Sequence, residues 1–416
     1  MQTVQLDEGL YRTTADNGVT VISEQMPGVR SVSVGMWVKT ASAHEPAAKM
    51  GVSHLLEHMV FKGTERRTAR DIALELEVRG GSLDAFTARD HTSYQARVLD
   101  EDLPRALDVI TDLVRNPTLR RDDLDLERKV VLEEISVVED TPDDLVFDLH
   151  NRALWPDHSY GFPILGTRST VSDLRASDLK ALHERTYHPR HVVIAAAGSV
   201  NHDSLLKLLT KCGWFTFDPG PSPVPISPPA ASEPSVTRLE RDLVQSHIVM
   251  GGPTFPQVDD RRYALILLNN VLGGGMSSRL FQRIREELGL AYSVYAFHSF
   301  YERHGLAGVY VGTHPSTADQ AREAIFTECR QLARGGLTEE VLTDGKQQLK
   351  GQLTLSLESS SSRMYRAAGF ALYEQPYRSV NETLDLIDAV TLEESANVAS
   401  EFFDPERYTV AWLGPN

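Results

Sequence analysis

The sequence predicts an α+β protein of two related domains, which are joined by a proline-rich linker. Each domain is expected to be a mainly antiparallel sheet covered by helices. Segments of alternating apolar and polar residues, typical of strands, occur between segments of helical periodicity. A chain of 416 residues is too long for one ordinary core and long enough for two domains of about 200. We therefore predict a first domain over residues 1–217, a linker over 218–236 and a related domain over 237–416.

The first strands are expected before residue 40. Residues 11–14 and 19–24 form a predicted hairpin around an Asn-Gly turn at 17–18, the pair that tight hairpin turns prefer. Residues 32–38 have the same alternating pattern. A sheet is thus predicted to precede the helix that we expect over residues 50–62.

That helix contains His54-Leu55-Leu56-Glu57-His58. At 3.6 residues per turn, His54 and His58 lie about 40° apart around the helix, and Glu57 lies about 60° to the other side of His54. All three side chains therefore share one face.

Two imidazoles four residues apart on a helix can bind one zinc ion, and a neighbouring carboxylate that is not a ligand can take a proton from water. The order His-x-x-Glu-His is the inverted form of a zinc peptidase motif. An amphipathic helix whose polar face carries two histidines by chance is the alternative. The motif alone suggests metal-assisted hydrolysis and leaves both interpretations open.

A third protein ligand is expected on another element, leaving one zinc position open for water. The predicted helix over 122–139 contains Glu127 and Glu134, which are seven residues apart and so share a face. Glu133 is equally acidic but points about 100° away from that face.

Further elements follow in alternation. We expect helices over 68–79, 103–115 and 122–139, and further helix to about residue 188 apart from an irregular stretch over 151–160. Strands are expected over 83–87, 92–98 and 192–197. From 218 to 234 the chain carries seven prolines with serine and alanine between them, which favours extended conformations over a packed core.

The part after the linker repeats the part before it. Residues 265–274 align with 54–63, and residues 337–352 align with 119–134. The second copy keeps the apolar positions but has neither the two histidines nor the three glutamates. The candidate residues are present together in one copy and absent together from the other. A shared function explains this better than the chance occurrence of polar residues on a helix surface.

These features resemble the pitrilysin family of zinc peptidases, the M16-type inverzincins, in the branch of the mitochondrial processing peptidases and their bacterial relatives. That family carries the inverted motif followed by a ligand glutamate in a Glu-Arg-x-x-x-x-x-Glu helix. The resemblance implies that His54, His58 and Glu134 bind Zn²⁺. It also implies that Glu57 is the general base and that Glu127 orients a ligand.

The resemblance extends to two other regions. In the family, the edge strand of the hairpin corresponding to 83–98 pairs with the substrate backbone, although this chain has Asp84 where the family has asparagine. Arg285 and Tyr292 match an arginine and a tyrosine that reach the substrate, and Tyr292 would help to stabilise the oxyanion. Without the resemblance, we would interpret them as a salt-bridging arginine and a half-buried tyrosine. The glycines at 273–275 are not followed by Lys-Ser/Thr, which argues against a nucleotide site.

Composition limits the partners. The formal charge of −16 disfavours nucleic acid and would attract cationic, extended peptides if the acidic residues line a cavity, although solubility alone explains such a charge. Cys212 and Cys329 are the only cysteines, so no disulfide framework is expected. No apolar run approaches the ~20 residues that span a bilayer, and residues 1–8 lack signal-peptide features. We expect a cytoplasmic protein without a membrane partner.

We therefore predict a zinc-dependent metalloendopeptidase that hydrolyses peptides or unfolded protein segments in an enclosed chamber. A homodimer is expected by analogy with the resembling branch. Two alternatives remain open at this point. One is a non-catalytic scaffold or partner subunit of a processing-peptidase-like complex, and the other is zinc-dependent hydrolysis of a non-peptide substrate.

Overall fold

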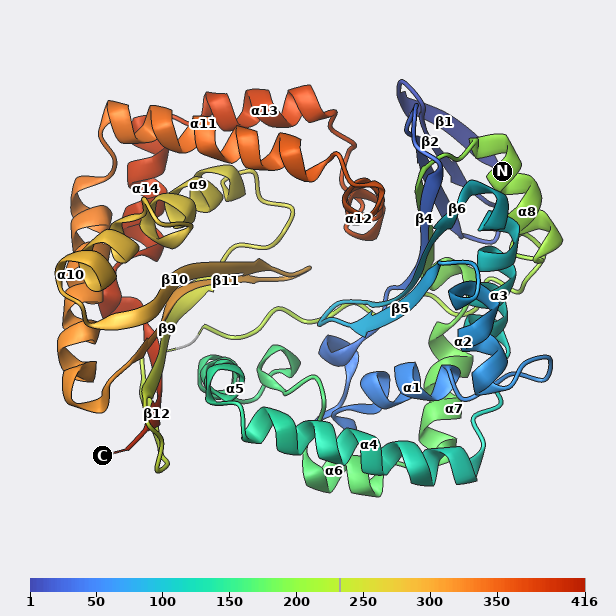
Figure 1. Cartoon of the computed structure of the whole chain (residues 1–416), viewed down its shortest axis with the longest axis horizontal. Helices are drawn as coiled ribbons and strands as arrows, with labels where there is room; N and C mark the ends of the chain where they lie inside the picture. The colour runs from blue at the N-terminus through green and yellow to red at the C-terminus, as the bar shows by residue number, and fades with distance from the viewer. Residues whose placement is uncertain (232, 416) are drawn as a thin grey trace. The chain divides into compact units, whose positions relative to one another are not determined.

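The computed structural model describes residues 1–231 and 233–415. Ser232, inside the predicted linker, and Asn416, at the end of the predicted second domain, lie outside the described residues. The chain forms two compact units (Figure 1). Unit 1 comprises Met1–Ile135, Pro163–Pro225 and Ser356–Tyr377, and unit 2 comprises Ser136–Phe162, Ile226–Leu355 and Arg378–Asn416.

Unit 1 contains a seven-stranded sheet in the order β1-β2-β3-β7-β4-β6-β5. Neighbouring strands are antiparallel, except that β3 and β7 are parallel. The strands are β1 (Gln2–Asp7), β2 (Leu10–Thr14), β3 (Thr20–Gln25), β4 (Ser31–Val38), β5 (Ser82–Thr87), β6 (Thr92–Leu99) and β7 (Val192–Gly198). The predicted hairpin is formed by β2 and β3, whereas the edge strand β1 was not predicted.

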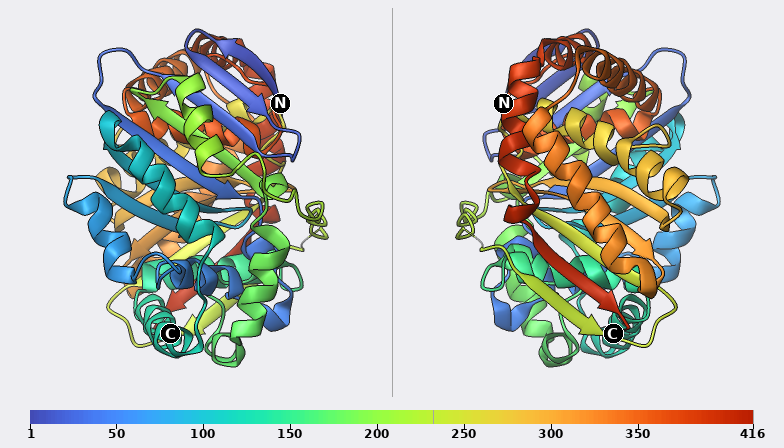
Figure 2. Two further views of the ribbon diagram at one scale, coloured as in Figure 1. Left: turned by 90° about the vertical axis from the view of Figure 1, so that its right-hand side faces the viewer. Right: turned by 90° about the vertical axis from the view of Figure 1, so that its left-hand side faces the viewer.

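Both faces of the central strands of this sheet, β4 and β7, are buried. In β4, Val34 and Met36 belong to a core on one face, while Trp37 points into a second core on the other, as the alternation of a strand requires. Figure 2 (left view) shows helices lying across the strands. The helices that contribute to the first core are α1 (Val52–Val60), α2 (Ala69–Glu77), α3 (Leu103–Arg115), α4 (Arg121–Glu139), α6 (Arg168–Asp173), α7 (Ala176–Thr186) and α8 (His202–Lys211).

Unit 2 contains a five-stranded sheet in the order β10-β11-β9-β12-β8, in which only β12 and β8 are parallel. Figure 2 (right view) shows β12 in red. The strands are β8 (Val236–Glu240), β9 (Ser246–Thr254), β10 (Ala291–Phe300), β11 (Gly305–Thr313) and β12 (Thr409–Gly414). The helices that form the larger core with this sheet are α9 (Arg262–Gly273), α10 (Ala318–Gly335), α11 (Glu339–Ser356), α13 (Val380–Ala389) and α14 (Leu392–Phe402). Each unit is thus an α+β fold with a mainly antiparallel sheet, as the sequence predicted.

The second face of each sheet is covered by a helix from the other half of the sequence. In unit 1, α12 (Ser360–Leu372) packs Met364 and Ala368 against Trp37, and Figure 1 shows α12 beside β4. In unit 2, α5 (Pro142–Leu154) packs Val146 against β9 and β12. The predicted domains were continuous stretches of chain with boundaries at 217 and 237. They did not include this exchange of α5 and α12 between the two halves of the sequence. Because both faces of each sheet are apolar, each sheet needs this second cover.

Among the helices of the described residues, none combines the length and the apolar content that crossing a bilayer requires.

Candidate metal centre

The start of α1 is held by a buried carboxylate. Glu45 Oε2 accepts a 2.8 Å hydrogen bond from the Gly51 N–H, and its Oε1 accepts a 2.7 Å bond from the Ser53 N–H. These are backbone donors that a helix leaves without partners at its first turn. Burial raises the pKa of Glu45 to about 7, against the opposing effect of the hydrogen bonds from Ser53 and Gly51. Glu45 therefore fixes where the helix begins.

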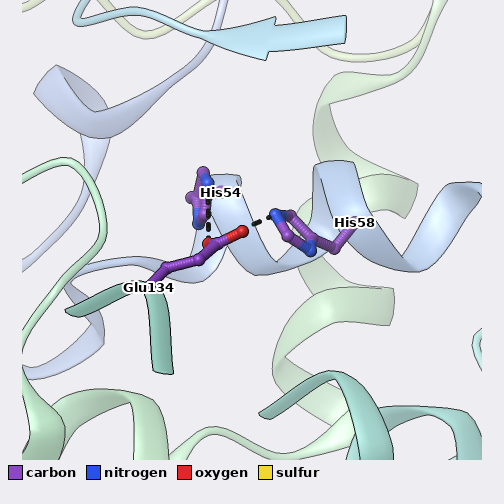
Figure 3. Close-up of side chains that lie close together, drawn as sticks. All are labelled: His54, His58 and Glu134. Carbon is purple, nitrogen blue, oxygen red and sulfur yellow. Dashed lines mark ion pairs between the residues drawn. The ribbon is translucent and has the colours of Figure 1, made fainter. Parts of the chain in front are cut away.

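The three predicted ligands converge. His54 and His58 lie on α1, and the Glu134 carboxylate from α4 lies between their rings (Figure 3). Glu134 Oε2 is 3.8 Å from His54 Nε2 and 3.6 Å from His58 Nε2. One ligand atom from each residue lies within 4.8 Å of the other two. The predicted ligand set is thus one cluster in space.

The chemistry of this cluster fits a zinc ion. Burial lowers the pKa of His54 to about 3, with a smaller contribution from His58, so the His54 ring is neutral, as a ligand must be. Glu134 Oε2 is buried and has no hydrogen-bond donor among the described residues. Tetrahedral zinc with bonds of about 2.0–2.1 Å separates its ligand atoms by about 3.3 Å. The separations of 3.6 and 3.8 Å between Glu134 and the two histidines are close to this value.

Glu57 lies on the same helix outside this ligand set and is buried. Its Oε2 accepts a 2.7 Å hydrogen bond from Thr87 Oγ1, at the end of β5. Burial raises the pKa of the Glu57 carboxyl, and the Thr87 hydrogen bond and the charge of His58 partly offset that rise. A raised pKa suits a carboxylate that exchanges protons near neutral pH.

Glu127 is 5% exposed and contacts both a predicted ligand and a cation. Its Oε2 lies 3.2 Å from His58 Nδ1, and its Oε1 lies 2.6 Å from Lys62 Nζ. A carboxylate at Nδ1 fixes the orientation of an imidazole whose other nitrogen faces a metal. Glu133, the alternative candidate for the third ligand, is exposed on α4.

The hairpin predicted beside the motif is formed by β5 and β6, and β5 is an edge strand of its sheet. Asp84 is exposed on β5, opposite Gln95 of β6. An edge strand presents unpaired backbone groups to which an extended chain can add.

Arg285 and Tyr292 lie in unit 2, in the π-helical segment η6 (Phe281–Glu287) and at the start of β10. The guanidinium carbon of Arg285 is 4.5 Å from the centroid of the Tyr292 ring, and Tyr292 is 78% exposed. The two residues contact each other, and their contribution to substrate binding stays a prediction.

The repeated segments occupy corresponding helices, α1 and α4 in unit 1 and α9 and α11 in unit 2. Gly345 of α11 stands at the position of Glu127 and is buried, and a Cβ on it would lie 3.0 Å from Val271 of α9. The second pair of helices packs closely at the position where the first pair holds a buried carboxylate.

Three further residues contribute to this region without having been singled out from the sequence, namely Glu45, Lys62 and Thr87. Lys62 lies four residues after His58, a spacing that places two side chains on one side of a helix and so could have indicated its role. Glu45 and Thr87 contact α1 from other parts of the chain, and no local pattern reveals such contacts.

The fold and the cluster together define a two-unit α+β protein with a candidate metal site of two histidines and one glutamate. The family description "Insulinase (Peptidase family M16)" matches residues 20–168, and "Peptidase M16 inactive domain" matches residues 173–349. The chain belongs to peptidase family M16.

Its relatives cover nearly the whole chain. A Bacillus subtilis protein named uncharacterized zinc protease YmxG is 40% identical over 98% of this chain and 98% of its own length. An uncharacterized zinc protease of Mycobacterium leprae is also 40% identical, over 98% of this chain and 92% of its own. The crystal structure of a protease from Helicobacter pylori has the same fold, with a TM-score of 0.91 at 22% identity over 98% of this chain and 99% of that one.

Proposed function

We propose that this protein is a zinc-dependent metalloendopeptidase that hydrolyses peptides or unfolded protein segments. The observation that carries the proposal is the convergence of His54, His58 and Glu134 with the buried Glu57 beside them on α1. Membership of family M16 and the names of the relatives support it.

In this proposal, His54 Nε2, His58 Nε2 and one oxygen of Glu134 hold Zn²⁺. When bound, zinc supplies a Lewis acid that polarises the peptide carbonyl and makes water more acidic. Glu57 takes a proton from the attacking water and gives it to the leaving amine. The C–N bond breaks, the carbonyl carbon gains the hydroxyl of water, and the amine nitrogen gains the other proton of water through Glu57. Thr87 orients the carboxylate of Glu57 during both transfers.

We propose that the substrate is an extended peptide that adds to the free edge of β5, near the exposed Asp84. The net charge of −16 favours cationic peptides over anionic ones. Arg285 would hydrogen-bond a carbonyl or carboxylate of the peptide, and the hydroxyl of Tyr292 would donate to the developing oxyanion. The hydrolysis would take place in an enclosed chamber.

The protein is also proposed to be a homodimer, by analogy with the resembling branch of the family. Sedimentation velocity at micromolar concentration is expected to give the mass of two chains. A monomer with full activity would contradict this part of the proposal.

The test of the proposed function is zinc-dependent cleavage of a peptide library, with the products sequenced. Removal of metal with a chelator should abolish cleavage, and adding back one equivalent of zinc should restore it. Protein that purifies without stoichiometric zinc and cannot be reloaded would favour the scaffold alternative. Protein that holds zinc and cleaves no peptide would favour a non-peptide substrate.

A further inference from the structure

The buried carboxylate of Glu127 divides its two oxygens between two partners. Oε2 faces Nδ1 of His58 at 3.2 Å, and Oε1 pairs with Nζ of Lys62 at 2.6 Å. A buried carboxylate is costly unless it is paired and hydrogen-bonded, and Lys62 is the cation that pairs with this one. The three side chains therefore form one chain of contacts, from Lys62 through Glu127 to His58.

The position of Lys62 follows from the helix. It stands four residues after His58, in the turn that closes α1, where its N–H donates a 3.2 Å hydrogen bond to the Met59 carbonyl. This spacing places the Lys62 and His58 side chains on the same side of the helix. Both can therefore reach Glu127, which lies on α4.

We infer that Lys62 is a positioning residue that strengthens zinc binding by fixing Glu127, which in turn orients the ring of His58. The inference rests on the proposed function, since it requires His58 to be a zinc ligand. Residues that orient a metal ligand typically contribute about 10–100-fold to metal affinity. Lys62 acts one contact further away, so its removal is expected to weaken zinc binding about 10-fold.

A different role for the same lysine would have the opposite effect. If Lys62 acted only as a positive charge near the metal, it would repel Zn²⁺, and its removal would tighten zinc binding. The direction of the change therefore separates the two roles.

The experiment compares zinc dissociation constants, measured by competition with a chromophoric chelator, for the parent chain and for Lys62→Met. Methionine keeps an unbranched side chain that is shorter by one atom, and it removes the charge. The matched control is Lys49→Met, because Lys49 forms a 3.0 Å ion pair with Asp178 in the same unit. We expect about 10-fold weaker binding for Lys62→Met and no change for Lys49→Met.

A double-variant comparison tests whether Lys62 acts through Glu127. If it does, Lys62→Met should have little additional effect on zinc affinity in a Glu127→Ala background, because the intermediary is already absent. Lys62→Arg keeps the ion pair and should restore most of the affinity. It also provides a variant that remains informative if Lys62→Met folds poorly.

Cobalt substitution supplies a spectroscopic measurement that does not depend on turnover. The visible absorption of the Co²⁺ protein should change in Lys62→Met and be unchanged in Lys49→Met, because only Lys62 is connected to a ligand. Equal or tighter zinc binding in Lys62→Met, or a full additional effect in the Glu127→Ala background, would overturn the inference. A parent chain that binds no zinc would overturn the proposed function instead.

Discussion

The hydroxyl of Thr87 donates a 2.7 Å hydrogen bond to Oε2 of Glu57. This bond joins the end of the edge strand β5 to the helix α1. The strand that we propose to receive the substrate and the proposed general base are therefore in direct contact. A carboxylate on a helix can rotate about its side-chain bonds, and this hydrogen bond restricts that rotation.

Thr87→Val is expected to lower kcat about 10-fold or more with little change in KM, because a hydrogen bond to a charged group contributes about 1.5–3 kcal/mol. Thr87→Ser keeps the hydroxyl and should retain most of the activity. Zinc content should be the same in both variants. Equal rates for Thr87→Val and the parent chain would show that Thr87 does not position the base.

Replacement of the third ligand should empty the site. Glu134→Ala removes one of three proposed protein ligands and is expected to lose most of the zinc. Glu133→Ala is the matched control, since its side chain is adjacent in sequence but exposed. Metal analysis of the purified variants checks both. Loss of zinc from Glu133→Ala alone would reverse the assignment.

Glu45→Ala is expected to destabilise the protein by about 2–5 kcal/mol, because two backbone N–H groups at the start of α1 lose their buried acceptor. Denaturant unfolding followed by circular dichroism measures the effect. Glu77→Ala, at an exposed position on α2, is the control and should change stability by less than about 0.5 kcal/mol. Similar stabilities for the two variants would contradict the role given to Glu45.

Changes in unit 2 should affect turnover without affecting the metal. Tyr292→Phe removes one hydroxyl, and loss of an oxyanion donor typically lowers kcat about 10²–10³-fold. Arg285→Ala should lower kcat/KM through weaker substrate positioning. Peptide assays and metal analysis on the same samples test both. If both variants cleave peptides at the parent rate, the roles carried over from the family are wrong.

Local patterns predicted the elements that carry the site. Helical periodicity predicted α1 and α4, and the Asn-Gly turn predicted the hairpin of β2 and β3. Helix geometry also placed Glu134 on the same face as Glu127 and Glu133 on another face, because residues seven apart share a face and neighbours do not. These inferences depend only on the chain within a few residues, where spacing determines direction.

Contacts between distant segments could not be predicted in this way. Periodicity indicates that a helix has a buried face, but it does not identify the sheet that buries it, so the exchange of α5 and α12 was not expected. The strand β1 is almost entirely exposed and lacks the apolar face by which a strand is recognised. The contacts of Glu45 and Thr87 with α1 likewise depend on the folded chain.

The most direct test of the central claim is zinc content and peptide cleavage measured on the same sample of Glu57→Gln. Glutamine has nearly the shape of glutamate but cannot accept the proton from water. Because Glu57 lies outside the proposed ligand set, the variant should keep one equivalent of zinc and lose nearly all hydrolysis. Full activity in this variant, or loss of its zinc, would contradict the role of Glu57 as the general base beside a metal held by His54, His58 and Glu134.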